Sequence, residues 1–97
     1  MSKLYVIVRD DLEPAQKAVQ AGHAVAEWVL KHADKGWNGT LVYLKATNKV
    51  RLLNVLFSMT CNGIENAPFF EPDIGNEITA VACLGKNKIV KKLPLLV

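Results

Sequence analysis

An unbroken apolar run near the start of the chain, Leu4 to Val8, constrains the fold more than any other feature of this sequence. A strand with one solvent-facing side alternates apolar and polar residues, whereas a strand covered on both faces is apolar throughout. The run is short and rich in β-branched residues, which favours a strand over a helix. We therefore expect a central strand with other layers packed on both of its faces.

The segment after this run carries the signals of a helix N-terminus. Residues 10–14, Asp-Asp-Leu-Glu-Pro, place acidic side chains and a proline where a helix begins, which suits the positive end of the helix dipole. We expect the helix to run from about Pro14 to Ala33, because basic residues and Gly36 then supply C-terminal signals. Most of its residues are apolar, so we expect most of its circumference to be buried.

The remaining segments predict further strands and helices in alternation. Strands are expected over residues 40–46, 67–70 and 78–84, and Pro68 places the second of these near an edge of the sheet. A helix is expected from about Lys49 to Cys61, followed at the end of the chain by a short closing helix over residues 87–92. In the longer of these two helices, apolar residues recur at helical spacing at Val50, Leu53, Leu56 and Phe57.

The elements follow the order β-α-β-α-β-β-(α), and the 97 residues suffice for one domain, residues 1–97. This alternation predicts an α/β fold with three layers, α/β/α, in which a mixed or mostly parallel sheet carries helices on both faces. Ligands of such sheets bind beyond the carboxyl ends of the strands. Residues 10–16 and 71–77 are the segments expected there.

Several classes of protein are disfavoured by what the chain lacks. Cys61 and Cys83 lie in apolar segments without metal-ligand spacing, so we expect buried, reduced thiols and no disulfide. Motifs for a serine nucleophile, a phosphate loop or a zinc site are absent, and we expect neither a metal nor a cofactor. The opening apolar run is too short for a secretory signal or a membrane span, which predicts a cytoplasmic protein without a membrane partner.

Positive charge is concentrated in two parts of the chain. The formal net charge is +3 and the isoelectric point about 9.0, which favours an anionic partner. One basic cluster lies in the C-terminal segment and the other flanks the end of the second predicted strand, and neither contains a carboxylate. The clusters consist of Lys86, Lys88, Lys91 and Lys92, and of Lys45, Lys49 and Arg51.

Four residues of the first predicted helix form a polar stripe: Gln16, Gln20, His23 and Glu27. They are separated by four, three and four residues, which places them on one side of an α-helix. Amide, imidazole and carboxylate groups together can donate hydrogen bonds, move a proton near neutral pH and orient the imidazole. The polar stripe is therefore a candidate functional site.

A structural interpretation of the polar stripe stays open beside the functional one. In it, Gln16 and Glu27 are solvated, while Gln20 and His23 hydrogen-bond to neighbouring backbone. Gly22, which precedes His23, costs roughly 1 kcal/mol in a helix interior relative to alanine. Close approach by another backbone or by a ligand would account for that glycine.

Residues 15–24, Ala-Gln-Lys-Ala-Val-Gln-Ala-Gly-His-Ala, resemble the first-helix signature of the type II peptidyl-tRNA hydrolase family, Gly-Lys-x-x-Ala-Gln-x-x-His-Ala. Residues 8–12 are similar to the family's Val-Arg-x-Asp-Leu, and residues 79–82 and 88–93 resemble its last strand and C-terminal segment. This weak similarity covers nearly the whole chain. It looks closest to the branch called peptidyl-tRNA hydrolase domain-containing proteins, which share Glu71 and a shortened loop after it.

The resemblance implies a four-stranded mixed sheet flanked by helices, and hydrolysis of the ester that joins a peptide to the 3′ end of tRNA. Gln20 and His23 match family positions. Gln16 stands where the family has a lysine, and Lys17 is one residue, or about 100° of helix, out of register. Loss of such a fixed charge commonly lowers a rate by about 10²- to 10³-fold.

Two further family positions fall outside the first helix. The family's loop aspartate corresponds to Glu71 or, in another alignment of the shortened loop, to Asp73. Thr79 corresponds to a strand threonine near that site. The expected catalytic residues are thus His23, Gln20, Gln16, Glu71 and Asp73, and the expected substrate-binding residues are Lys17, Asp11, Thr79, Lys86 and Lys88.

The mechanism implied is attack of water on the ester, with His23 or a loop carboxylate as general base. Gln16 and Gln20 would donate hydrogen bonds to the substrate or the oxyanion. The basic clusters would hold the tRNA backbone, and Lys17 would hold a phosphate near the helix N-terminus. Two other hypotheses remain: a tRNA-binding module that has lost turnover, and a protein-interaction module without an RNA role. In each case we expect a monomer or a homodimer.

Overall fold

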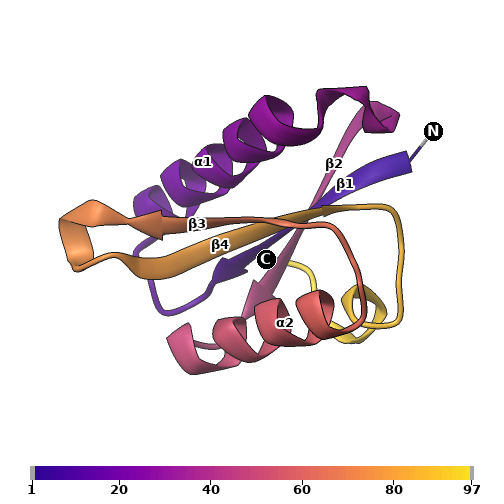
Figure 1. The fold of residues 1–97 in the computed structure, drawn as a ribbon. Helices are drawn as coiled ribbons and strands as arrows, with labels where there is room; N and C mark the ends of the chain where they lie inside the picture. The colour runs from indigo at the N-terminus through magenta and orange to yellow at the C-terminus, as the bar shows by residue number, and fades with distance from the viewer. Residues whose placement is uncertain (1, 97) are drawn as a thin grey trace.

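The computed structural model describes residues 2–96, in which a four-stranded sheet carries α1 on one face and α2 on the other (Figure 1). The predicted α/β fold with three layers is therefore confirmed. The elements are β1 (Ser2–Arg9), α1 (Pro14–His32), β2 (Trp37–Ala46), α2 (Lys49–Cys61), β3 (Ala67–Glu71) and β4 (Glu77–Leu84), with short 3₁₀ turns at Ala33–Lys35, Pro72–Ile74 and Val90–Lys92.

The sheet is mixed, with strand order β2-β1-β4-β3. β1 pairs with β2 in parallel and with β4 in antiparallel fashion, and β3 pairs antiparallel with β4. β1 is thus internal, and its Leu4, Val6, Ile7 and Val8 are fully buried, as the apolar run predicted. β3 lies at an edge, which is the position expected for a strand that contains Pro68.

Each face of the sheet has its own hydrophobic core. On the α1 face, Leu4 and Val6 pack with Trp28, and small alanines on both sides of the contact let the helix lie close to the strands. On the α2 face, Ile7 and Val81 pack with Met59 and its neighbours on the helix. These contacts fix the position of α1 relative to β1, including the segment that joins the end of β1 to the start of α1.

The outer side of α1 is more exposed than predicted. α1 buries only Gln20, Ala21, Ala24 and Trp28, and Leu30 is 80% exposed, so the expectation that most of its circumference is buried is wrong. A helix that rests on a sheet is covered on one side, and among residues 2–96 no further layer covers the other.

The apolar residues of α2 divide between the side that faces the sheet and the side that does not. Leu52, Val55 and Met59 are buried, whereas three of the four residues singled out by their spacing, Val50, Leu53 and Phe57, project outward. Both sets recur at helical spacing, so the period alone does not decide which one faces the sheet.

Smaller differences concern the cysteines and the end of the chain. Cys83 is buried and its pKa is raised to about 11 by burial, but Cys61, in the last turn of α2, is exposed, which corrects the expectation of two buried thiols. Both are free thiols, as predicted. The expected closing helix is only the 3₁₀ turn Val90–Lys92. No helix among residues 2–96 is long and apolar enough to cross a membrane.

Candidate functional site

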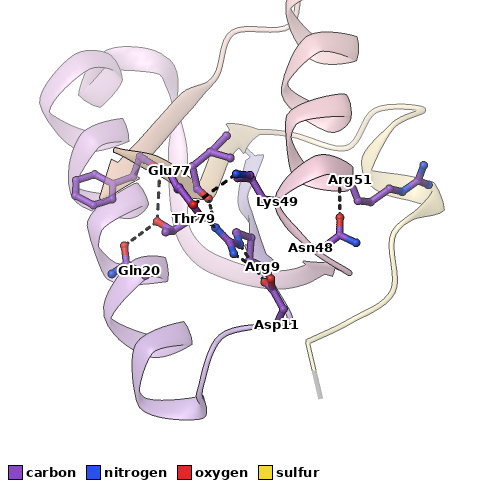
Figure 2. A network of polar contacts seen from close by, with 10 residues as sticks. Arg9, Asp11, Gln20, Asn48, Lys49, Arg51, Glu77 and Thr79 are labelled. Atoms are coloured by element: carbon purple, nitrogen blue, oxygen red, sulfur yellow. Dashed lines mark hydrogen bonds and ion pairs between the residues drawn. The ribbon is translucent and has the colours of Figure 1, made fainter. Parts of the chain in front are cut away.

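Gln20 is the centre of a buried polar network between α1 and the β3–β4 edge of the sheet. Its side chain is 1% exposed, and the hydroxyl of Thr79, on β4, donates to Gln20 Oε1 at 2.7 Å (Figure 2). Gln20 Nε2 donates to Glu71 Oε1 at 3.0 Å and to Gln16 Oε1 at 3.2 Å. Both amide hydrogens and the amide oxygen are therefore in use.

An irregularity in strand pairing brings Thr79 to this network. Phe69 pairs with Ala80, but the next residue, Phe70, pairs with Ile78, so Thr79 is skipped in the register. A bulge of this kind interrupts the alternation of side chains along a strand. Thr79 therefore contacts α1 on the same face as Ala80, although regular alternation would place it on the α2 face.

The Thr79 hydroxyl sets the orientation of the Gln20 amide. A hydroxyl hydrogen aimed at Oε1 leaves Nε2 facing away from β4, toward Glu71 and Gln16. The amide in turn holds one oxygen of the Glu71 carboxylate, which is half-buried at the end of β3. Among residues 2–96, Glu71 Oε2 has no hydrogen-bond partner. The chain thus presents an oriented carboxylate with one oxygen available.

His23 lies one turn further along α1, beside the same strand. Its exposed imidazole stacks on Phe69, with ring centroids 4.3 Å apart and planes 9° from parallel. Phe69 and Glu71 are two residues apart in β3 and therefore share a face. His23 and Glu71 consequently flank the same stretch of α1 and β3.

The polar stripe is only partly a unit in the structure. Gln16 and Gln20 are hydrogen-bonded to each other, but Glu27 pairs with Lys31 at 3.3 Å and does not orient His23. Gly22 is exposed, and a Cβ placed there would meet no atom within 4 Å among the described residues. The close backbone approach inferred from this glycine is therefore absent within residues 2–96.

Arg9 organises a second polar network, at the end of the sheet where β1 ends and β4 begins. Only 8% exposed, it donates to both oxygens of Asp11 at 3.0 and 2.9 Å and to Glu77 Oε1 at 2.8 Å (Figure 2). Lys49, in the first turn of α2, reaches the other oxygen of Glu77 at 3.4 Å. The hydrogen bonds from Arg9 hold the pKa of both carboxyl groups, Asp11 and Glu77, below their ordinary values.

Sequence reasoning missed Arg9 and Phe69. A charged residue at the end of a fully apolar strand was the available signal for Arg9, because a buried guanidinium requires carboxylate partners. For Phe69 the signal was its two-residue spacing from Glu71 in a strand. Neither signal specifies the partner on α1.

Several predicted substrate-binding residues have other roles or other places. Asp11 is bound to Arg9, and Lys17 donates to Asp10 Oδ1 at 2.7 Å, a hydrogen bond that lowers the pKa of Asp10. Asp73 is exposed in the 3₁₀ turn after β3 and, among residues 2–96, has no hydrogen bond to the Gln20 network. Of the expected residues, the structure brings together Gln16, Gln20, Glu71 and Thr79, with His23 beside them.

The two predicted lysines of the C-terminal segment lie outside this network. Lys86 and Lys88 are exposed, and Lys88 lines a hollow beside α2, on the opposite face of the sheet from α1. Within residues 2–96, no group of three or more histidine, cysteine, aspartate or glutamate side chains is placed to hold a metal ion. The groups that the structure brings together at the site are a carboxylate, two amides, a hydroxyl and, beside them, an imidazole.

Comparison with known proteins supports the fold. No protein-family model and no curated protein sequence matches the chain. The chain is similar to the solved structure of a protein of unknown function from Agrobacterium tumefaciens strain C58, with a TM-score of 0.75 and 18% sequence identity over 99% of this chain and 98% of the other. This likeness shows that the same arrangement of strands and helices occurs in a protein of very different sequence.

Proposed function

We propose that the chain is a metal-independent hydrolase that cleaves the ester between a peptide and the 3′ end of tRNA, with Glu71 as general base. One observation carries the proposal: Thr79 orients the Gln20 amide, and that amide holds Glu71 Oε1 at 3.0 Å. A buried amide whose oxygen accepts from Thr79 and whose nitrogen donates to a half-buried carboxylate is suited to positioning a base. The substrate class follows from the resemblance of residues 15–24 to the type II family.

The reaction needs only water and the groups described. Glu71 Oε2 accepts a proton from water, whose oxygen attacks the ester carbonyl carbon. The bond from that carbon to the ribose oxygen then breaks, and the proton passes from Glu71 to the ribose oxygen that leaves. The products are a tRNA with a free 3′ hydroxyl and a peptide carboxylic acid, which releases its proton to solvent and leaves as the carboxylate.

His23 has a separate role in this proposal. Its exposed ring stacks on Phe69, and a ring N–H can donate to the ester or to the leaving oxygen. Glu71 is preferred as the base because Gln20 fixes its carboxylate, whereas Asp73 has no such support among residues 2–96.

A tRNA-binding module without turnover is the second candidate. Gln16 occupies the position of the family's lysine, and Lys17 is already bound to Asp10. Neither residue then supplies a free positive charge to stabilise the oxyanion, which favours binding without hydrolysis.

Single-turnover cleavage of an N-acetylated aminoacyl-tRNA distinguishes the two candidates. We expect cleavage by the wild type and a loss of at least about 100-fold in Glu71→Gln. The matched control is Asp73→Asn, which removes a carboxylate two residues away and should keep the wild-type rate. Cleavage by the wild type no faster than the spontaneous reaction would contradict the hydrolase and leave the binding module.

A further inference from the structure

A second charged surface lies on the α2 side of the sheet, away from Gln20 and Glu71. A hollow of about 390 Å³ separates α2 from the C-terminal segment, and its charged lining residues are Arg51, Lys88 and Lys92. Figure 2 shows the Arg51 side chain pointing from the first turn of α2 toward the C-terminal segment. Asn54, from the next turn of the helix, adds a polar side chain to the lining.

An adjoining hollow extends this surface toward the end of β2. It measures about 160 Å³ and shares Arg51 and Lys92 with the first hollow. Its other charged lining residues are Lys45 and the acidic Asp10. We call the two hollows together the α2 groove. From Arg51 to Asn62, which also lines it, the groove follows α2 for about three helical turns.

The positive charge of the α2 groove is largely uncompensated. Among residues 2–96, no carboxylate oxygen lies within 4.0 Å of a charged nitrogen of Arg51, Lys88 or Lys92. Lys45 is the exception, with Asp10 at 3.8 Å. By contrast, Lys17 of α1 is paired with Asp10 at 2.7 Å. Within the described part of the chain, three unpaired cations thus outweigh the one carboxylate of the groove, Asp10, and a surface of net positive charge attracts phosphate groups.

An apolar surface borders the α2 groove along the same helix. Leu53, Leu56 and Phe57 line a further hollow of about 390 Å³, and Asn54 contributes to both this hollow and the α2 groove. Phe57 is 71% exposed. Cations that follow a phosphate backbone, next to an exposed aromatic ring on which a base can stack, are the combination that binds unpaired nucleic-acid strands.

We propose that the α2 groove binds single-stranded nucleic acid, with phosphates against Arg51, Lys88 and Lys92 and a base on Phe57. A base-paired duplex presents no base faces to Phe57 and fits the groove less well. The inference goes beyond the proposed hydrolase, because it uses the opposite face of the sheet and needs no ester and no turnover.

Binding of fluorescein-labelled ten-nucleotide oligomers, rU₁₀ and dT₁₀, tests the proposal by fluorescence anisotropy at two salt concentrations. We expect the wild type to bind and the double variant Arg51→Gln/Lys92→Gln to bind at least about tenfold more weakly. The slope of log K against log salt concentration should become shallower by about 1.4, because two phosphate contacts are lost. The matched control is Lys3→Gln/Lys31→Gln, which removes the same charge from exposed residues of β1 and α1 and should change affinity less than about threefold.

A third variant separates stacking from charge. Phe57→Ala should weaken binding by about fivefold or more without changing the salt dependence. The proposal is overturned if the wild type binds neither oligomer, if both double variants lose affinity equally, or if Phe57→Ala has no effect. Complete competition by millimolar inorganic pyrophosphate would also overturn it, in favour of a small-anion site. Preference for rU₁₀ over dT₁₀ would assign the ligand to RNA, and the reverse preference to DNA.

Because these oligomers carry no ester, the binding result is independent of the hydrolase. Oligomer binding without cleavage of peptidyl-tRNA would support the nucleic-acid site in the α2 groove and contradict the hydrolase. Cleavage without oligomer binding would support the hydrolase and contradict the nucleic-acid site. Thermal unfolding of each variant, followed by circular dichroism, verifies that its fold is intact.

Discussion

Replacement of Thr79 by valine removes one hydroxyl from the interior and nearly nothing else. The two side chains have almost the same shape, and Thr79 and Gln20 are 0% and 1% exposed. In the variant, Gln20 Oε1 loses the donor that lies at 2.7 Å and stays buried. A buried polar atom without a partner costs about 1–3 kcal/mol, which is 5 to 15 °C in the melting temperature of a domain of this size.

Thermal and urea unfolding measure this cost, with Thr40→Val as the matched control. Thr40 is an exposed threonine of the edge strand β2, so its substitution should change the free energy of unfolding by less than about 0.5 kcal/mol. Gln20→Met completes a double-mutant cycle, in which the double variant should be more stable than the two single losses predict. If Thr79→Val is as mild as Thr40→Val, the hydroxyl does not satisfy the amide and the network is not as described.

Three further predictions concern other parts of the structure. Gly22→Ala should raise the free energy of unfolding by about 0.5–1 kcal/mol in urea titrations, because the added methyl group meets open space; destabilisation would mean that the site is occupied. The folded-state pKa values of Asp11 and Glu77 are lowered, so their stabilisation is complete above the ordinary values of 3.8 and 4.5 and is lost as pH falls below them. Arg9→Met should be strongly destabilising at pH 7 and should flatten this acid dependence, and an unchanged urea midpoint would refute the network. Cys61 should react rapidly with a disulfide reagent, and Cys61→Ser should remove that fast phase; a persistent fast phase would place the accessible thiol elsewhere.

The architecture followed from local patterns. The apolar run Leu4–Val8 predicted an internal strand, and Pro68 predicted an edge strand, because full burial and a missing N–H each restrict where a strand can lie. The bounds of α2 were predicted to the residue, since Asn48 supplies the N-terminal cap and Asn62 follows the last turn. Each of these features is encoded within a few residues of the chain.

The candidate site depended on features that are not local. Gln20 was recognised through its helical spacing, but Glu71 lies 51 residues away and was one of two equally placed carboxylates in the sequence. The bulge that turns Thr79 toward α1 has no distinct sequence signal, because regular alternation assigns that residue to the other face. The exposed side of α1 was not predicted, because apolar residues lie all around that helix. In α2 the apolar spacing likewise does not say which side faces the sheet.

Single-turnover cleavage of peptidyl-tRNA by four proteins tests the central claim most directly: the wild type, Thr79→Val, Glu71→Gln and the double variant. If Thr79 acts by orienting the amide that holds the base, Thr79→Val lowers the cleavage rate when Glu71 is present. The same substitution causes no further decrease in rate when Glu71 has been replaced by glutamine. An equal slowing of the wild type and of Glu71→Gln would show that Thr79 acts independently of Glu71, and the positioning account would be wrong.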